Sequence, residues 1–280
     1  MKYRHSFHAG NFADVHKHVT LLAVLTALKR KDKGFLYLET HAGRGAYDLG
    51  DPAGGNRGQH AGLADVLSYS RGEPEIVDYA QAVAQWRTAM RNGQAYPGSP
   101  VLAAGSLRTQ DRAVLVEIQP PEAHALERAL HSVAKVRVEI GDGYERVRAY
   151  LPPAERRGAL LIDPPYEETA RDFDRAAAAA GEALEKFASA VVLLWYPVKD
   201  ARDTVLWRNR LARKLEVEIL VSELWVHPCD SRVALNGSGL LILNPPYQVA
   251  ERMREWLPVL RRMLDAEGTG GQLVEVVNAT

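Results

Sequence analysis

The sequence predicts an α/β fold in which a mostly parallel sheet of seven strands carries helices between its strands. Two observations lead to this prediction. Short, nearly continuous apolar runs end at Gly, Asp, Asn or Pro, as buried parallel strands do. Stretches with apolar residues at helical spacing lie between these runs, and such strand–helix–strand alternation gives right-handed crossovers within one sheet.

The expected strands follow one another along the chain. They cover residues 35–38, 113–116, 136–140, 159–162, 190–195, 215–226 and 239–243. The run at 215–226 alternates apolar and polar residues over part of its length, so we expect an antiparallel strand near an edge of the sheet. The expected helices between the strands cover residues 121–134, 173–187 and 203–214.

The segment 46–96 interrupts this alternation because it contains no clear strand. Its first part, 48–59, is glycine-rich and irregular, whereas 61–67 and 75–91 have helical patterns. We interpret 46–96 as a small helical insertion within a single domain that spans residues 1–280. Such an insertion serves either as scaffold or as a lid or substrate arm, and the pattern favours neither.

The composition is that of an ordinary globular protein. Of the 280 residues, 46% are hydrophobic and 25% are charged, and 35 basic residues balance 35 acidic ones. Zero formal net charge argues mildly against a protein that coats nucleic acid non-specifically. The N-terminal part nevertheless carries more basic than acidic side chains, which allows a local basic face.

The sequence lacks the features of membrane, secreted and cysteine-rich proteins. No apolar run approaches the roughly 20 residues of a membrane span, and no apolar segment of a signal peptide follows the basic N-terminus. The single cysteine, Cys229, excludes an internal disulfide and a cysteine-rich zinc site. We therefore expect a cytoplasmic protein without a membrane partner.

The motif Asp163-Pro-Pro-Tyr166 directly follows the expected strand 159–162, at the end where α/β sheets bind ligands. These residue types suit methylation of an exocyclic amino nitrogen, whose lone pair is delocalised into its ring. The Asp163 carboxylate and the Pro164 carbonyl can each accept a hydrogen bond from the amino group, which localises the lone pair for attack on the methyl group of S-adenosylmethionine (SAM). Tyr166 offers a flat face for an unstacked base. The motif therefore predicts catalysis at Asp163.

A second copy of the motif, Asn244-Pro-Pro-Tyr247, follows the expected strand 239–243. In SAM-dependent methyltransferases with a Rossmann-like fold, the catalytic copy follows the fourth strand, and Asp163 occupies that place. We interpret residues 244–247 as structural by this analogy with the fold.

Three other strand ends carry residues that suit SAM. Glu39 and the glycine loop 43–45 follow the first strand and allow the backbone to approach a nucleotide-like cofactor. Glu117 follows the second strand, where a carboxylate can bind both ribose hydroxyls. Asp142 and Gly143 follow the third strand, where an acid often faces the adenine amino group of SAM. The ordered set is more specific than any single member and predicts SAM as the cofactor.

The N-terminal segment combines histidine, aromatic and basic side chains. His5, His8, His16, His18 and His41 raise the possibility of a metal site, because neutral imidazoles bind zinc. The chain has neither an HExxH motif nor a cysteine partner, and the strand-end residues account for catalysis without a metal, so we expect none. The aromatic and basic mixture instead suits single-stranded RNA.

Several motifs resemble the RlmJ family of bacterial 23S ribosomal RNA adenine-N6 methyltransferases, and the resemblance covers nearly the whole chain. The matching segments are Tyr3-Arg-His-Ser-Phe-His-Ala-Gly-Asn, which is highly specific, Thr40-His-Ala-Gly, Tyr96-Pro-Gly-Ser-Pro100, Leu161-Ile-Asp-Pro-Pro-Tyr166, Leu194-Trp-Tyr-Pro197 and Asn244-Pro-Pro. The resemblance implies a Rossmann-like class I SAM-dependent methyltransferase core with a small helical insertion.

The resemblance also implies roles for single residues. Asp163 is the implied catalytic acid. Tyr3 is implied to meet the target RNA, with His5 and Lys17 beside it. Glu39 stands where we expect an aspartate, which keeps the carboxylate. The implied SAM contacts are His18, His41, Ser99, Glu117, Asp142, Gly143 and Asp163.

The leading hypothesis is SAM-dependent methylation of N6 of one specific adenine in 23S ribosomal RNA. We expect a monomer that acts on RNA that is protein-free or in an early assembly intermediate. The same motif also serves methyltransferases of DNA adenine and of protein glutamine, which stay open as alternatives. A non-catalytic RNA-binding module that has kept the fold is a further alternative, against which the intact Asp163, Glu117 and Asp142 argue.

Overall fold

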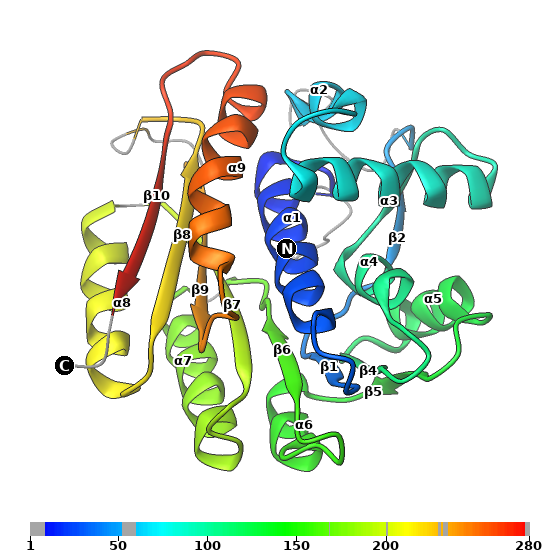
Figure 1. Ribbon diagram of the computed structural model, residues 1–280, viewed down its shortest axis with the longest axis vertical. Helices are drawn as coiled ribbons and strands as arrows, with labels where there is room; N and C mark the ends of the chain where they lie inside the picture. Colours follow the sequence, from blue (N-terminus) through cyan, green and yellow to red (C-terminus); the bar gives the residue numbers. More distant parts are fainter. Residues whose placement is uncertain are drawn as a thin grey trace.

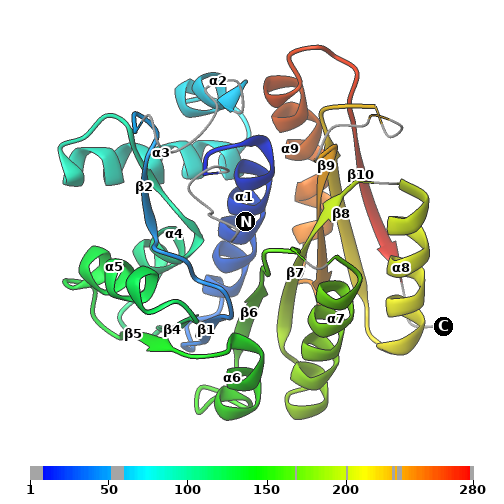
Figure 2. The same cartoon turned by 180° about the vertical axis from the view of Figure 1, so that it is seen from behind.

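The computed structural model describes residues 9–51, 60–167, 169–199, 201–228, 231 and 235–277. Helices cover both faces of one eight-stranded sheet, so the molecule has three layers (Figure 1; Figure 2 shows the reverse side). The prediction of an α/β fold with a mostly parallel sheet is confirmed.

The strand order across the sheet is β10-β8-β9-β7-β6-β1-β4-β5. The neighbouring strands from β7 to β5 are parallel, β9 is antiparallel to β7 and β8, and β10 is antiparallel to β8. The bounds are β1 Leu36–Glu39, β4 Arg112–Glu117, β5 Val136–Ile140, β6 Gly158–Ile162, β7 Val191–Val198, β8 Ile219–Trp225, β9 Gly237–Leu243 and β10 Gly271–Val277.

The sheet has one strand more than the seven that the sequence predicts. The additional strand, β10, lies at the edge, and none of its residues is fully buried. Gln272 and Glu275 interrupt its apolar residues, so β10 lacks the continuous apolar run of the central strands. The predicted strand 215–226 is β8, which is second from this edge and antiparallel to both neighbours, as its alternating pattern indicates.

Each face of the sheet has its own hydrophobic cluster. One face carries α1 Phe12–Lys29, α4 Ser99–Ser106, α5 Pro120–Leu130 and α9 Val249–Leu264. The other face carries α6 Gly143–Tyr150, α7 Thr169–Lys186 and α8 Ala201–Lys214. Among the helices of the described ranges, none combines the length and the apolar character that a membrane span requires.

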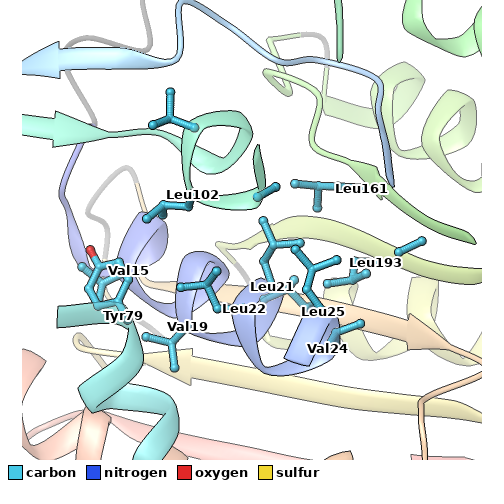
Figure 3. Close-up of a cluster of buried hydrophobic side chains, with 14 of the residues drawn as sticks. Val15, Val19, Leu21, Leu22, Val24, Leu25, Tyr79, Leu102, Leu161 and Leu193 are labelled. Carbon is cyan, nitrogen blue, oxygen red and sulfur yellow. The ribbon is translucent and has the colours of Figure 1, made fainter. Parts of the chain in front are cut away.

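The sequence pattern does not predict α1, most of whose residues are buried on the face of the sheet that also carries α4, α5 and α9 (the α1 face). The sheet lies on one side of it, and α3 Pro74–Met90, α4 and α9 pack around it. Buried residues, apolar and polar, therefore occupy nearly its whole circumference rather than one apolar stripe. Figure 3 shows Leu21 and Leu25 of α1 beside Leu161 of β6 and Leu193 of β7. Asn11 caps the helix by accepting a hydrogen bond of 2.9 Å from the Asp14 backbone N–H.

The segment 46–96 contains the two expected helices, α2 Leu63–Ser68 and α3 Pro74–Met90. The prediction that it contains no strand is wrong, because β2 Ala46–Asp48 and β3 Ala95–Pro97 form a short antiparallel pair. Three residues on each strand are too few to produce a recognisable alternating pattern. The pair joins the two ends of the segment, and α3 and α2 pack on α1 and α9 respectively. A contact of this segment with RNA stays a prediction.

Candidate active site

The carboxyl ends of the parallel strands meet at one edge of the sheet. This edge brings together Glu39 from β1, Glu117 from β4, Asp142 after β5 and Asp163 after β6. Ligands of open α/β sheets bind outside this edge. The geometry therefore gathers the predicted strand-end residues in one place.

Glu117 is fixed to the glycine loop after β1. Its carboxylate accepts hydrogen bonds of 2.8 Å from the backbone N–H groups of Gly43 and Gln119. Burial raises the pKa of Glu117, and these hydrogen bonds oppose the rise. Gly43 and Gly45 both have positive φ, and a Cβ on Gly45 would lie 2.4 Å from the Leu126 side chain. The loop thus needs both glycines for its conformation and for its approach to α5.

Asp142 and Gly143 connect β5 to α6 beside the end of β1. Asp142 caps α6, because its carboxylate accepts a hydrogen bond of 2.9 Å from the Tyr144 N–H. A Cβ on Gly143 would lie 1.8 Å from the carbonyl oxygen of Thr40, so only glycine fits this approach. Arg175 of α7 donates a hydrogen bond of 2.9 Å to the second Asp142 oxygen.

Two exposed apolar residues flank these acids, and the sequence pattern did not single them out. Ile118 follows Glu117 and is 59% exposed, and Ile140 lies opposite Glu117 in the β4–β5 register and is 44% exposed. Together they offer an apolar surface on which the flat adenine of SAM fits, while Glu117 offers acceptors for its ribose hydroxyls. The residues at this edge therefore fit SAM.

His41 lies between the glycine loop and α6. Its ring contacts Tyr144 edge-on, with 4.8 Å between the ring centroids, and its Nδ1 lies 2.8 Å from the Thr40 hydroxyl. Burial lowers the pKa of His41 to about 4, although the carboxylates of Asp163 and Asp142 oppose this. The imidazole is therefore neutral near pH 7, which avoids repulsion of a sulfonium cation.

Glu39 is fully buried, and two hydroxyl groups donate to its carboxylate. Ser99 donates to one oxygen at 2.6 Å, and Tyr37 donates to the other at 2.8 Å. Burial raises the pKa of Glu39 to about 7, and the two hydrogen bonds only partly oppose it. The implied SAM contact Ser99 is therefore held by an acid at the end of β1.

The Glu39→Gln protein is expected to lose a pH dependence of stability that the wild type has. Because the pKa of Glu39 rises from its ordinary 4.5 to about 7 on folding, the folded protein retains a proton between these values that the unfolded chain releases. Stability therefore falls by about 3 kcal/mol as the pH rises from about 4.5 to about 7. Glutamine imitates the protonated acid and removes this decline.

Denaturant unfolding of both proteins across this pH range measures the difference. Tyr37→Phe serves as a control, because it removes one hydroxyl donor and keeps the ionisable group. The same slope of stability against pH in wild type and Glu39→Gln would show that Glu39 does not titrate in this range.

Lys17 of α1 joins two carboxylates from different elements. Its Nζ lies 2.6 Å from an Asp163 oxygen and 2.9 Å from an Asp14 oxygen, and all three side chains are largely or fully buried. Burial alone lowers the pKa of Lys17, but the two carboxylates outweigh it and raise that pKa well above its ordinary value. The lysine therefore stays charged and fixes Asp163 beneath α1.

His18 lies next to Lys17 on α1, with its Nδ1 3.1 Å from the Tyr96 hydroxyl and its Nε2 3.9 Å from an Asp14 oxygen. Its ring is fully buried, so its implied contact with SAM stays a prediction. Composition and spacing alone do not point to Lys17, His18 or Ser99, because their positions depend on α1 and α4.

Within the Asp163-Pro-Pro-Tyr166 motif the four residues differ in exposure. Pro164 is buried, Pro165 is exposed, and Asp163 keeps 12% of its side chain accessible. Tyr166 is only 4% exposed, and its hydroxyl donates to the Trp195 carbonyl at 2.6 Å. A base can stack on the Tyr166 ring only after that ring is uncovered, so the stacking role of Tyr166 stays a prediction.

The second copy of the motif lies at the opposite edge of the sheet. Because β9 is antiparallel to β7, its last residue, Leu243, pairs with Val192 near the start of β7. Asn244 donates to the carbonyls of Ala188 and Ala190, and Tyr247 is 82% exposed. Strand direction thus separates Asn244 from the residues that gather around Asp163.

Some predicted residues lie outside the described residues, namely Tyr3, His5, His8 and Cys229. His16 lies inside them, and serine hydroxyls contact both of its ring nitrogens, at 3.0 and 2.8 Å. Among the described residues no group of three or more His, Cys, Asp and Glu side chains could hold a metal ion.

The strand order, with antiparallel β9 between β7 and β8, and the acids at the ends of β1, β4 and β6 define a class I SAM-dependent methyltransferase. A family model described as "Ribosomal RNA large subunit methyltransferase D, RlmJ" matches residues 32–278. The chain belongs to this RlmJ family, whose members use SAM as the methyl donor.

Two curated relatives and one solved structure resemble the chain over nearly its full length. The proteins named "Ribosomal RNA large subunit methyltransferase J" from Haemophilus influenzae and Escherichia coli are each 38% identical to it. The alignment with the Haemophilus influenzae protein covers 98% of each of the two chains, and the alignment with the Escherichia coli protein covers 96% of each. A crystal structure of a Legionella pneumophila protein is 34% identical, covers 96% of this chain and 98% of its own, and has a TM-score of 0.85.

Proposed function

We propose that this protein transfers a methyl group from SAM to N6 of one specific adenine in 23S ribosomal RNA. The observation that carries the proposal is the Asp163-Pro-Pro-Tyr166 motif at the carboxyl end of β6, between the predicted cofactor residues and β7. Membership of the RlmJ family and the names of its two curated relatives support ribosomal RNA of the large subunit as the substrate.

The chemistry follows from the side chains around Asp163. Bound SAM supplies an electrophilic methyl group on a sulfonium sulfur. The Asp163 carboxylate accepts a hydrogen bond from one N6 hydrogen of adenine, and the Pro164 carbonyl accepts one from the other. These two acceptors localise the nitrogen lone pair towards the methyl group, and Asp163 then takes the proton that N6 loses.

Several further assignments belong to the same proposal. His18, His41, Ser99, Glu117, Asp142, Gly143 and Asp163 bind SAM, and Tyr3, His5 and Lys17 line the RNA side of the site. The enzyme acts as a cytoplasmic monomer of one domain with the insertion 46–96, and its substrate is protein-free 23S RNA or an early assembly intermediate. Both the family resemblance and the neutral overall charge support one specific RNA target.

The experiment that tests the proposal is methylation of protein-free 23S RNA with isotopically labelled SAM, followed by mapping of the labelled nucleotide. We expect a single N6-methyladenosine. Equal amounts of DNA with adenine and of a glutamine-containing protein substrate in the same reaction serve as competitors. If the label appears on the DNA or the protein and not in the RNA, that competitor is the substrate and the proposed substrate is wrong. If calorimetry detects no SAM binding, the chain is a non-catalytic RNA-binding module.

A further inference from the structure

We propose that Trp195, rather than Tyr166, is the aromatic surface against which the target adenine lies, and that a buried Ser238–His16–Ser222 chain positions it. This inference rests on the proposed function and assigns one residue of its substrate site. It starts from a difference in exposure, because Tyr166 is 4% exposed whereas Trp195 keeps part of its side chain accessible.

Trp195 is next to Asp163 at the edge of the sheet. β6 and β7 are parallel with Ile162 opposite Leu194, so the residues that follow, Asp163 and Trp195, are neighbours. Their side chains share the α1 face, because Leu161 and Leu193 two residues earlier both belong to the α1-side cluster. Lys17 contacts both, with its Nζ 2.6 Å from Asp163 and 5.8 Å from the centre of the indole ring.

The sheet order places Trp195 on the substrate side of Asp163. Four of the predicted cofactor residues, namely His41, Glu117, Asp142 and Gly143, lie at the ends of β1, β4 and β5. These strands are on one side of β6, and β7 is on the other side. In-line transfer requires the accepting nitrogen to approach the methyl group from the side opposite the sulfur. A nucleotide held at Asp163 therefore lies towards β7, where the partly exposed indole offers a π face for its base.

The indole is held by a chain of hydrogen bonds inside the α1 face. Trp195 Nε1–H donates to the Ser238 hydroxyl at 2.9 Å, and that oxygen lies 3.0 Å from His16 Nδ1. His16 Nε2 lies 2.8 Å from the Ser222 hydroxyl. The three residues of this chain are fully buried.

The neutral state of His16 lets its ring contact both serines as one donor and one acceptor. Burial lowers the pKa of His16 to about 3, so near pH 7 one ring nitrogen carries a proton and the other accepts. The Ser238 hydroxyl accepts from Trp195, and it lies 3.4 Å from the Ala13 carbonyl as well as 3.0 Å from His16 Nδ1. The tautomer of His16 sets which of its ring nitrogens donates to a serine and which accepts. Tyr166 adds a hydrogen bond to the Trp195 carbonyl at 2.6 Å. Because these hydrogen bonds already hold the Trp195 indole in place, it loses little conformational entropy when a base stacks on it.

The test compares methylation of 23S RNA by the wild type, Trp195→Leu and Trp195→Phe, with SAM affinity measured by calorimetry. Trp195→Leu is expected to lower kcat/KM for RNA by about 10- to 100-fold, and Trp195→Phe by less than about fivefold, because phenylalanine keeps a π face. SAM affinity is expected to change by less than about twofold in both. If Trp195→Leu does not fold, Trp195→Met replaces it, because methionine fills the space without a ring.

Trp207→Leu is the matched control, because it removes another partly exposed indole, which packs against the hydrophobic cluster on the opposite face of the sheet. Equal kcat/KM for wild type and Trp195→Leu would overturn the inference, and a large loss in Tyr166→Leu alone would assign the base to Tyr166. A wild type that methylates no adenine in the RNA contradicts the proposed function instead, so the two failures are distinguishable.

A double-mutant cycle tests Ser238 as the positioning residue. Ser238→Ala is expected to lower kcat/KM for RNA about three- to tenfold in the wild type, because the indole N–H loses its acceptor. The same substitution is expected to have less than a twofold effect, on the order of experimental error, in the Trp195→Phe background, which has no N–H. Equal losses in both backgrounds would show that Ser238 does not act through Trp195.

Discussion

The Asp163→Ala protein is expected to fold and to bind SAM within about tenfold of the wild type, yet to methylate 23S RNA at least about 1000-fold more slowly. The rate falls because the substitution removes both the acceptor for an N6 hydrogen and the group that takes the proton. The fold survives because Lys17 keeps its second partner, with its Nζ 2.9 Å from an Asp14 oxygen.

Single-turnover methylation, with the fold checked by thermal unfolding, measures this effect. Asn244→Ala is the matched control, because it changes the first residue of the second motif at the opposite edge of the sheet. It removes hydrogen bonds to Ala188 and Ala190, so a modest loss of stability and a rate within about threefold of the wild type are expected. Full activity in Asp163→Ala with loss in Asn244→Ala would reverse the assignment of the two motifs.

The strand ends could be predicted from the sequence because each rests on local chemistry. A buried parallel strand is a run of apolar residues, and an acid or a glycine lies at its end or within three residues of it, at Glu117, Asp142, Gly143 and Asp163. The backbone of Gly143 approaches the Thr40 carbonyl so closely that no Cβ fits, which explains the glycine at this position. Strand direction depends on the whole sheet rather than on local sequence. Because β9 is antiparallel to β7, Asn244 lies at the opposite edge of the sheet from Asp163, and this separates the two motifs more clearly than the analogy with the fourth strand of other methyltransferases.

The part of the site that comes from α1 could not be predicted in the same way. A helix enclosed on nearly every side has no single apolar stripe, and its polar residues Asp14, His16 and Lys17 are buried. Lys17 pairs with a residue 146 positions away, and His16 contacts Ser238, which is 222 positions away. Only the family resemblance pointed to Lys17, and nothing in the sequence pattern pointed to Trp195.

The exposure of an aromatic side chain also depends on packing that the motif does not contain. Tyr166 has the sequence position of a base-stacking residue, yet Phe173 and Trp195 pack against its ring at centroid distances of 4.7 and 5.6 Å. The backbone of Tyr166 has a φ of +51°, which turns the chain at this point. Burial raises the pKa of the Tyr166 hydroxyl well above its ordinary value. The motif gives the catalytic acid, and the fold decides which ring beside that acid meets solvent.

Lys17→Met is expected to lower stability by about 3–5 kcal/mol near pH 7, because it leaves the buried carboxylates of Asp14 and Asp163 without their shared cation. Methyl transfer is expected to fall at least about 100-fold. Without the lysine, the Asp163 carboxylate loses the contact of 2.6 Å that holds it in place, and a displaced Asp163 is a poor acceptor for the amino group.

The rate of methyl transfer, SAM affinity and the free energy of unfolding, all measured near pH 7, separate the loss of Asp163 positioning from unfolding. Lys29→Met is the matched control, because it removes a lysine from the last turn of the same helix, where its Nζ donates to the Ser106 carbonyl at 3.1 Å. This control is expected to keep the rate within about twofold and to lose little stability. A Lys17→Met protein with wild-type rate and stability would mean that Asp163 holds its position without a counter-charge. A folded variant that keeps its affinity for SAM but binds the RNA more weakly would instead assign Lys17 to direct contact with the RNA.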